Sequence, residues 1–196
     1  MTEVELSRAA VVAGPIVILL VVGFFGISYI ISTVLGFSIS LNLPIVMRVV
    51  GGVLVVTGLA IAGWTFKYRS PSDMIVSTYV TFTKLFRRNP IAERLGRTEP
   101  LVIEGLQRYV RNPFYFGVIM MTFGWALVGG YIFVLVATVI LLLWFRVVLI
   151  PFEEKELLAL FGEQYARYKE DVPMLVPFTK WKKHEIRVVS REASNN

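Results

Sequence analysis

Long apolar stretches separated by polar regions dominate the pattern along the chain. Residues 9–36 and 45–66 form apolar segments, each long enough to cross roughly 30 Å of hydrocarbon as a helix. Residues 114–128 form a third segment, which would be only about 22 Å long, and Gly129 and Gly130 join it to a fourth over residues 131–150. The pattern therefore predicts an all-α protein with about four transmembrane helices, the last two forming a tight hairpin.

Beyond Pro151 the pattern changes to that of an amphipathic helix. Apolar and aromatic residues recur at spacings of four, four and three, at Leu157, Phe161, Tyr165 and Tyr168. This spacing places their side chains on one face of a helix, with the charged residues mainly elsewhere. We expect this face to lie against the hairpin or against the membrane surface.

The composition agrees with a membrane protein. Apolar residues make up 56% of the 196 residues and charged residues only 17%, and the mean hydropathy is +0.67, values far from those of an ordinary soluble domain. The chain has no cysteine and a single histidine, His184. Disulfides, zinc-thiolate sites, a cysteine nucleophile and a histidine metal cluster are therefore excluded, and no metal site is predicted.

The positive charges predict how the helices are oriented. Residues 67–111 carry nine basic and four acidic side chains, and eight more basic residues lie from position 153 onward, whereas residues 37–44 and 129–130 carry none. Lys and Arg near membrane segments are retained on the cytoplasmic side. We therefore expect a multi-pass protein with both termini and the large loop in the cytosol. Its basic surface suits anionic lipids, and no motif points to nucleic acid.

Three regions follow from this pattern. Residues 1–66 hold the two N-terminal transmembrane helices, and residues 67–112 form the basic cytosolic loop. Residues 113–196 hold the hairpin, the amphipathic helix and a polar tail. No strand followed by a glycine-rich nucleotide loop and a helix is found, which excludes the soluble nucleotide-binding fold that this motif marks.

Polar residues stand at the cytosolic start of the expected hairpin. Asn112 followed by Pro113 is a favoured way to begin a helix, so this pair can do no more than start the third membrane segment. A helix start with free N–H groups, beside Arg111 and Tyr115, is also a suitable place for a carboxylate ligand. Both interpretations stay open on the sequence.

Charged residues also stand at the other end of the hairpin. Glu153 and Glu154 follow Pro151, where acidic residues are favoured by the helix dipole without any ligand. Alternatively, the two carboxylates accept hydrogen bonds from a ribose or hold an ammonium group. Arg146, about one turn inside the fourth segment, is either a snorkelling side chain or a functional cation within the membrane that binds substrate.

Together these residues resemble the isoprenylcysteine carboxyl methyltransferase family, whose relatives include the phospholipid N-methyltransferases. Both groups are integral membrane enzymes that use S-adenosylmethionine. The matching core begins near residue 94, and the order and spacing agree over roughly the last half of the chain. The residues that carry the resemblance are Leu101, Val102, Glu104, Gly105, Arg108, Tyr109, Val110, Arg111, Asn112, Pro113, Tyr115, Gly117, Gly124, Glu153, Glu154, Leu157, Phe161, Gly162, Tyr165, Tyr168, Val172, Pro173 and Pro177.

The resemblance implies that S-adenosylmethionine binds between the turn before the third helix and the start of the amphipathic helix. A lipid or prenylated acceptor would enter laterally from the bilayer. Glu153, Glu154 and Tyr115 are also the candidates for catalysis if the acceptor must lose a proton. The expected cofactor contacts are Val102 and Gly105 on the nucleoside side, and Arg111, Asn112, Tyr115, Glu153 and Glu154 on the amino-acid and ribose side.

The acceptor itself is not fixed by the sequence. A prenylated or lipid-like carboxylate is favoured, with a phospholipid amine as the alternative. Many carboxyl methyltransferases have histidine where this chain has Asn112, while bacterial relatives and phospholipid methyltransferases also carry asparagine there. This departure weakens the carboxylate assignment more than the cofactor assignment. The oligomeric state is not predicted.

Two further classes of protein share features with this sequence. Sterol-type membrane reductases share a similar Arg, Pro, Tyr, Gly turn, but they usually have Asn before the tyrosine and an acid after the glycine. Phe114 and Val118 occupy these positions here, which argues against reduction. A non-catalytic membrane scaffold is also compatible with the composition, and it predicts no cofactor affinity.

Overall fold

The computed structural model describes residues 19, 21–37, 39–65, 67, 101 and 103–177. Within these residues the structure is helical, with no strands and one isolated bridge between Ser40 and Tyr131. The all-α prediction is therefore confirmed for this part of the chain. The elements are the helix Val21–Val34, α2 (Ile45–Thr65), the 3-10 turn η1 (Gly105–Arg108), α4 (Pro113–Gly129), α5 (Ile132–Trp144), the π turn η2 (Phe145–Leu149), α6 (Ile150–Phe161) and α7 (Glu163–Asp171).

Several expectations fall outside the described residues. They concern the start of the first apolar segment, nearly all of the basic loop including the beginning of the family core near residue 94, the residue Val102, and the tail with His184. The second segment is described almost entirely, and α2 begins at the predicted residue. The predicted third segment differs from α4 by one residue at each end.

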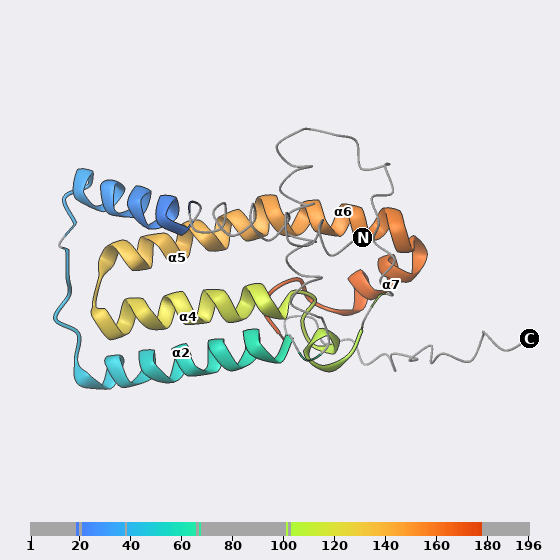
Figure 1. Cartoon of the computed structure of the whole chain (residues 1–196), viewed down its shortest axis with the longest axis horizontal. Coiled ribbons are helices and arrows are strands. Elements are labelled where there is room, and N and C mark those ends of the chain that lie inside the picture. Colours follow the sequence, from blue (N-terminus) through green and yellow to red (C-terminus); the bar gives the residue numbers. More distant parts are fainter. Residues whose placement is uncertain are drawn as a thin grey trace, which may run out of the picture.

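The long helices lie side by side along the molecule (Figure 1). α4 lies between α2 and α5, and the helix Val21–Val34 lies along α5 on the other side. Two edge-to-face aromatic contacts hold this last pair, Phe24 with Trp144 and Tyr29 with Phe133, at centroid distances of 6.1 and 5.8 Å. η1, α6 and α7 gather at one end of these helices.

α2 and α4 approach closely because glycines face each other at two levels. A Cβ added to Gly58 would lie 2.6 Å from the carbonyl oxygen of Gly117, and one added to Gly51 would lie 2.7 Å from that of Gly124. These distances are shorter than real Cβ contacts, so no side chain fits at either level. Small residues at such interfaces let two helix backbones pack directly. Another glycine of α2, Gly52, has nothing within 4 Å of an added Cβ.

A two-residue connection joins α4 to α5. Gly130 ends α4 with a φ of +67°, a left-handed conformation that glycine adopts without steric cost. Its carbonyl oxygen accepts a hydrogen bond of 2.7 Å from the backbone N–H of Leu41. The segment before α2 is thereby fixed to the turn before α5, at the end of the molecule opposite α7 (Figure 1).

The structure differs from the sequence interpretation around Pro151. A helix boundary was expected there, but one helix runs without interruption over Ile132–Phe161. The π turn η2 comes directly before α6, whose first turn contains Pro151. Proline has no N–H to donate, and the wider turn accommodates this missing bond, so the helix continues.

The helix instead breaks at Gly162. Its φ of +52° and ψ of −127° lie outside the region that other residues readily adopt. The single amphipathic helix predicted beyond Pro151 is therefore two helices, α6 and α7. This break turns α7 back toward η1 (Figure 1).

In the part of the chain that the structure describes, two helices are long and apolar enough to cross a membrane, Ile45–Thr65 and Ile132–Phe161. Val21–Val34 and Pro113–Gly129 are apolar but shorter, and α4 measures about 25 Å at 1.5 Å per residue. Many valines, leucines and isoleucines on these helices are exposed, such as Val46, Val53 and Val56 of α2. Such apolar outer faces are what contact with lipid requires.

Candidate functional site

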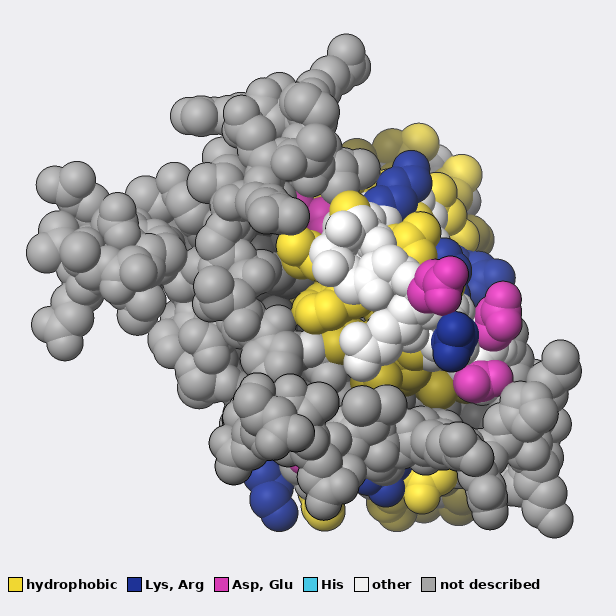
Figure 2. Space-filling model, turned by 90° about the vertical axis from the view of Figure 1, so that its right-hand side faces the viewer, with side chains coloured by type: hydrophobic (Ala, Val, Ile, Leu, Met, Phe, Trp, Pro, Cys, Tyr) yellow, Lys and Arg dark blue, Asp and Glu magenta, His cyan; other side chains and the backbone are white. Residues whose placement is uncertain are grey.

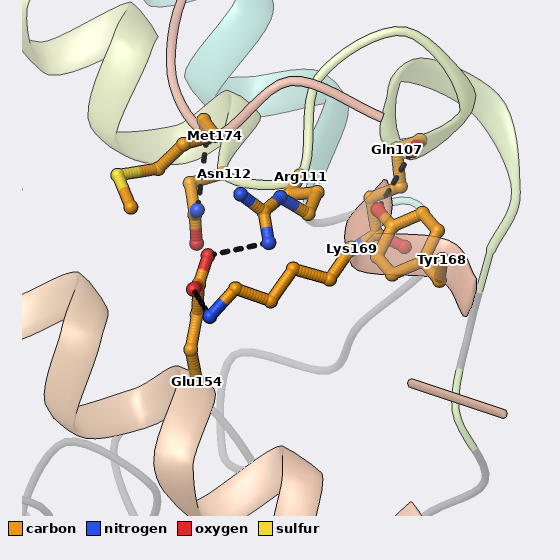
Figure 3. Close-up of polar contacts among 7 residues, drawn as sticks. All are labelled: Gln107, Arg111, Asn112, Glu154, Tyr168, Lys169 and Met174. Carbon is orange, nitrogen blue, oxygen red and sulfur yellow. Dashed lines mark hydrogen bonds and ion pairs between the residues drawn. The ribbon is translucent and has the colours of Figure 1, made fainter. Parts of the chain in front are cut away.

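Two segments far apart in sequence meet just before α4. The backbone N–H of Arg111 donates a 2.9 Å hydrogen bond to the carbonyl oxygen of Pro173, and Asn112 Nδ2 donates one of 2.9 Å to that of Met174 (Figure 3). Asn112 occupies the N-cap position of α4, but its side chain makes no capping bond. Its amide instead fixes the segment that follows α7 against the start of α4.

Glu154 is the centre of a buried ionic cluster. Its side chain is only 3% exposed, and its two oxygens face two cations: Arg111 Nη1 lies 2.9 Å from Oε1, and Lys169 Nζ lies 2.9 Å from Oε2. Arg111 is 5% exposed and Lys169 about half exposed. Figure 3 shows the three side chains converging from the turn before α4, from α6 and from α7.

Several polar atoms of this cluster keep unused hydrogen-bonding capacity. Among the described residues, Arg111 Nε and Nη1, Glu154 Oε1 and Gln107 Oε1 are buried and have no hydrogen-bond partner. The distance between Arg111 and Glu154 is that of an ion pair, but their geometry does not satisfy the angles of a hydrogen bond. Buried donors and acceptors without partners are costly, so this cluster is suited to a polar ligand.

Glu153 makes a different contact from its neighbour. The hydroxyl of Tyr115 donates a 2.8 Å hydrogen bond to Glu153 Oε1. The Tyr115 ring packs on Phe145, with ring centroids 4.6 Å apart, and it belongs to the apolar cluster built around Phe145, Leu149 and Ile150. The pair Tyr115–Glu153 therefore lies at the border between the apolar helices and the polar cluster.

Two buried tyrosines of α7 close the cluster on its other side. The hydroxyl of Tyr168 donates a 2.7 Å hydrogen bond to the backbone carbonyl of Gln107 in η1 (Figure 3). Burial raises the pKa of Tyr165 above its ordinary value, Glu154 raises it further, and Arg111 lowers it. Burial also raises the pKa of Tyr168, as does the neighbouring Tyr165. Both phenols therefore stay neutral at physiological pH.

Gly105 lies apart from the Glu154 cluster. Its φ is +58° at the start of η1, and it lines a hollow of about 410 Å³. This hollow lies between the end of α2 and η1. The residues around it are Trp64, Glu104, Gly105, Leu106, Arg108 and Tyr109.

The predicted site residues are thus brought together only in part. Arg111, Asn112, Tyr115, Glu153 and Glu154 gather at one end of the molecule. Arg146 lies in the π turn η2 with an exposed side chain, and no described contact joins it to the cluster. Its role in substrate binding stays a prediction.

Sequence reasoning missed three members of the cluster. Lys169 completes the ionic cluster, and Tyr165 lies against Arg111. The backbone carbonyl of Gln107 accepts the hydrogen bond from the Tyr168 hydroxyl. Lys169 follows Glu154 by fifteen residues, whereas side chains on one helix meet when they are three or four residues apart. Gly162 was the available signal, since a glycine after an apolar run is a common helix stop.

On the described part of the end of the molecule that holds this cluster, charged side chains of both signs lie at the surface (Figure 2). Those on α6 and α7 include the exposed pair Arg167 and Glu163, 3.2 Å apart. The turn at the opposite end, around Gly130, carries no charged residue. The cluster therefore lies where apolar helices meet a charged surface.

Comparison with protein families gives one match that covers more than half of the chain. The model of the family described as phospholipid methyltransferase matches residues 46–164. This range contains α2 except its first residue, all of α4, α5 and α6, and all the predicted site residues.

Among curated proteins the similar ones are named methanethiol S-methyltransferases. The protein of Pseudomonas deceptionensis is 30% identical over 137 residues, which are 64% of this chain and 46% of that protein. The enzyme of Crocosphaera subtropica is 38% identical over 73 residues, covering 36% and 27%. Methanethiol S-methyltransferase 1 of Bradyrhizobium diazoefficiens is 28% identical over 126 residues, covering 62% and 41%. The chain spans less than half the length of these relatives, and no solved structure matches it.

Proposed function

Since the chain belongs to the phospholipid methyltransferase family and is a membrane-associated methyltransferase, we propose that it transfers a methyl group from S-adenosylmethionine to a hydrophobic acceptor at the cytosolic membrane surface. The resemblance found in the sequence is confirmed at the level of this family of membrane methyltransferases.

The observation that carries the proposal is the set of buried polar atoms without partners around Arg111 and Glu154. S-adenosylmethionine has a carboxylate, an ammonium group and ribose hydroxyls, and these groups match a guanidinium with unused donors and a carboxylate with an unused acceptor. Arg111 and Asn112 would hold its carboxylate, and Glu154 its ammonium group or ribose. When bound, the cofactor supplies an electrophilic methyl group on a sulfonium.

Gly105 would approach the nucleoside part, as the resemblance implies. The hollow that it lines is bordered by the rings of Trp64 and Tyr109. Val102 would belong to the same side and lies outside the described residues. This part of the proposal is supported by the position of Gly105 alone.

A thiol is the acceptor that the relatives favour, since their names give methanethiol as the molecule they methylate. A prenylated or lipid-like carboxylate remains the second candidate, supported by the resemblance of the sequence motif to the isoprenylcysteine enzymes. A phospholipid amine is the third, supported by the description of the family. An acceptor of any of these classes would reach the site from the apolar side of the helices.

We also propose the membrane arrangement. α2 and the long helix Ile132–Phe161 would cross the bilayer, with the helix Val21–Val34 and α4 as the remaining crossings. The end with α7 would face the cytosol, as the distribution of basic residues indicates. Membrane lipids would then be the surrounding partners, and nucleic acid would not bind.

Transfer of labelled methyl groups tests the proposal directly. The full chain in nanodiscs is supplied with methyl-labelled S-adenosylmethionine and, separately, with a long-chain alkanethiol, a farnesylated cysteine and phosphatidylethanolamine. We expect labelled product from the thiol, and a smaller yield or none from the other two. Labelling of the carboxylate or the amine alone would replace the thiol as acceptor. No labelled product, and no bound cofactor, would contradict the proposed function.

A further inference from the structure

Gln107 carries a polar side chain that the proposed contacts with the donor do not use. Its Oε1 is buried and, among the described residues, has no hydrogen-bond partner. Its backbone carbonyl is occupied, because the hydroxyl of Tyr168 donates a 2.7 Å hydrogen bond to it (Figure 3). A buried acceptor without a partner is costly to the folded protein, so Oε1 is suited to accept a hydrogen bond from a ligand.

The side chain of Gln107 does not belong to the hollow beside η1. The other residues of the stretch 104–109 line that hollow, whereas Gln107 does not. A 3-10 helix has about three residues per turn, so consecutive side chains point in different directions. Gln107 Oε1 therefore faces a different part of the molecule from the hollow.

Two tyrosines of α7 connect Gln107 with the Glu154 cluster. The rings of Tyr168 and Tyr165 lie with their centroids 5.8 Å apart, and Tyr165 lies against Arg111. Burial raises the pKa of Tyr168 most, Tyr165 raises it further, Arg111 lowers it and Glu154 raises it. Charges act on a titrating group more strongly the closer they lie. Gln107, which contacts Tyr168 directly, is therefore a neighbour of the cluster.

The position of Gln107 along the chain matches the order of the parts of the donor. In the proposed function, Gly105 approaches the nucleoside and Arg111 holds the carboxylate. Gln107 comes two residues after Gly105 and four before Arg111, so its Cα lies within about 7 Å of the first and about 14 Å of the second. The ribose joins the base to the amino-acid part, and a residue between the two ends is placed to reach it.

The chemistry of the amide oxygen selects the group that it binds. Gln107 Oε1 can only accept a hydrogen bond, so its partner must be an N–H or O–H group. S-adenosylmethionine offers its ammonium group, the amino group of adenine and two ribose hydroxyls. The positive ammonium group suits the Glu154 carboxylate better, and the adenine amino group lies at the end of the base away from the amino-acid part. The ribose hydroxyls remain.

We propose that Gln107 Oε1 accepts a hydrogen bond from a ribose hydroxyl of S-adenosylmethionine, which leaves Glu154 to bind the ammonium group. This inference rests on the proposed function and adds a specificity-determining residue to the donor site. The protein should therefore discriminate against donors and products that lack a ribose hydroxyl, and Gln107 should be the source of this discrimination.

Binding of deoxyribose analogues tests the contact without relying on activity. S-adenosylhomocysteine and its 2′-deoxy and 3′-deoxy analogues are titrated calorimetrically into the full chain in nanodiscs. For the unchanged protein, we expect removal of one of the two hydroxyls to raise Kd at least about tenfold. In Gln107→Met, which keeps the length of the side chain but accepts no such bond, removal of the same hydroxyl should change Kd by less than about threefold.

Two further variants make the comparison specific. Gln107→Asn keeps an amide but withdraws it by one methylene, so it should also lose the discrimination between the ligands. Gln164→Met removes an exposed amide from α7 and is the matched control. It should keep the discrimination of the unchanged protein.

The possible results lead to distinct conclusions. The same penalty for each deoxy analogue in the Gln107 variants as in the unchanged protein would overturn the contact. An equal loss of affinity for all three ligands in Gln107→Met would also overturn it, because it would indicate a structural role alone. Absence of S-adenosylhomocysteine binding by the unchanged, folded protein would instead contradict the proposed function itself.

Discussion

At the scale of the residue, the candidate site depends on one buried carboxylate, that of Glu154, which contacts two cations. Glu154 holds Arg111 from the turn before α4 and Lys169 from α7, so three separate segments meet at one side chain. The family motif allowed Arg111 and Glu154 to be predicted as site residues. Lys169 could not be predicted, because its approach depends on the direction that the chain takes after Gly162.

Loss of the lysine should weaken the donor site without destroying the fold. Lys169 is about half exposed and Glu154 keeps Arg111 as a second partner, so the expected effect of Lys169→Met is a 3- to 10-fold rise in the Kd for S-adenosylhomocysteine, in the range of about 1 kcal/mol. Arg167→Met removes the cation of an exposed ion pair on the same helix and serves as control. Equal Kd values for the two variants would show that Lys169 has no part in the site.

The buried tyrosines predict how stability changes with pH. The pKa values of Tyr165 and Tyr168 are raised in the folded protein, mainly by burial, whereas an unfolded tyrosine ionises near about pH 10. Above that pH the unfolded chain releases protons that the folded chain keeps. Stability should therefore be unaffected by these groups below about pH 9 and should fall as the pH rises above about 10.

Thermal unfolding in detergent between about pH 8 and pH 11 measures this dependence. Tyr165→Phe removes one of the two groups, and its Tm should fall less steeply with pH than that of the unchanged protein. Tyr109→Phe replaces an exposed tyrosine and should leave the slope unchanged. Parallel slopes for all three proteins would contradict the account of the buried phenols.

At the scale of the element, α2 and α4 begin at or next to the residues that the sequence predicted, whereas the helix boundary expected near Pro151 is absent and the helix breaks at Gly162. Pro113 and the two glycines after Val128 fixed the ends of α4 in advance, because proline starts helices and glycine ends them. The continuous helix through Pro151 was not predictable from local preferences, because a proline after an apolar run usually marks a helix boundary. Here the π turn η2 before it lets the helix continue.

Alanine at Gly58 and alanine at Gly52 of α2 should change the stability of the protein in opposite directions. Gly58→Ala places a Cβ against the carbonyl oxygen of Gly117, and such overpacking costs about 1–3 kcal/mol. Gly52→Ala meets open space and should stabilise α2 by about 0.5–1 kcal/mol through its better helix propensity. Thermal unfolding of the two variants in detergent should therefore shift Tm in opposite directions. A Tm lowered equally by both would mean that α2 does not pack on α4 through Gly58.

At the scale of the whole molecule, charge separates the two ends. The end with α6 and α7 carries charges of both signs (Figure 2), and the opposite turns carry none, with Arg48 in the first turn of α2 as an exception. The four apolar segments and this asymmetry were evident in the sequence. The way the start of α4 meets the segment after α7 was not, because hydrogen bonds such as that from Asn112 to Met174 join residues 62 positions apart.

Labelling of single cysteines tests the proposed orientation, and the absence of native cysteines makes it unambiguous. Ser40→Cys marks the exposed loop before α2, and Arg167→Cys marks the exposed face of α7. In intact bacterial cells that express the protein, a membrane-impermeant maleimide should react with the first variant only, and with both after the cells are opened. The reverse pattern would place α7 outside the cell.

The proposed function depends on binding of the methyl donor by the polar cluster around Glu154. Calorimetric titration of S-adenosylmethionine into the full chain in nanodiscs, beside Glu154→Gln and the exposed control Glu163→Gln, tests it most directly. We predict saturable binding by the unchanged protein and by the control, and a Kd raised at least about tenfold in Glu154→Gln, equivalent to about 1.4 kcal/mol. Unchanged affinity in a folded Glu154→Gln protein would place the donor elsewhere and contradict the account.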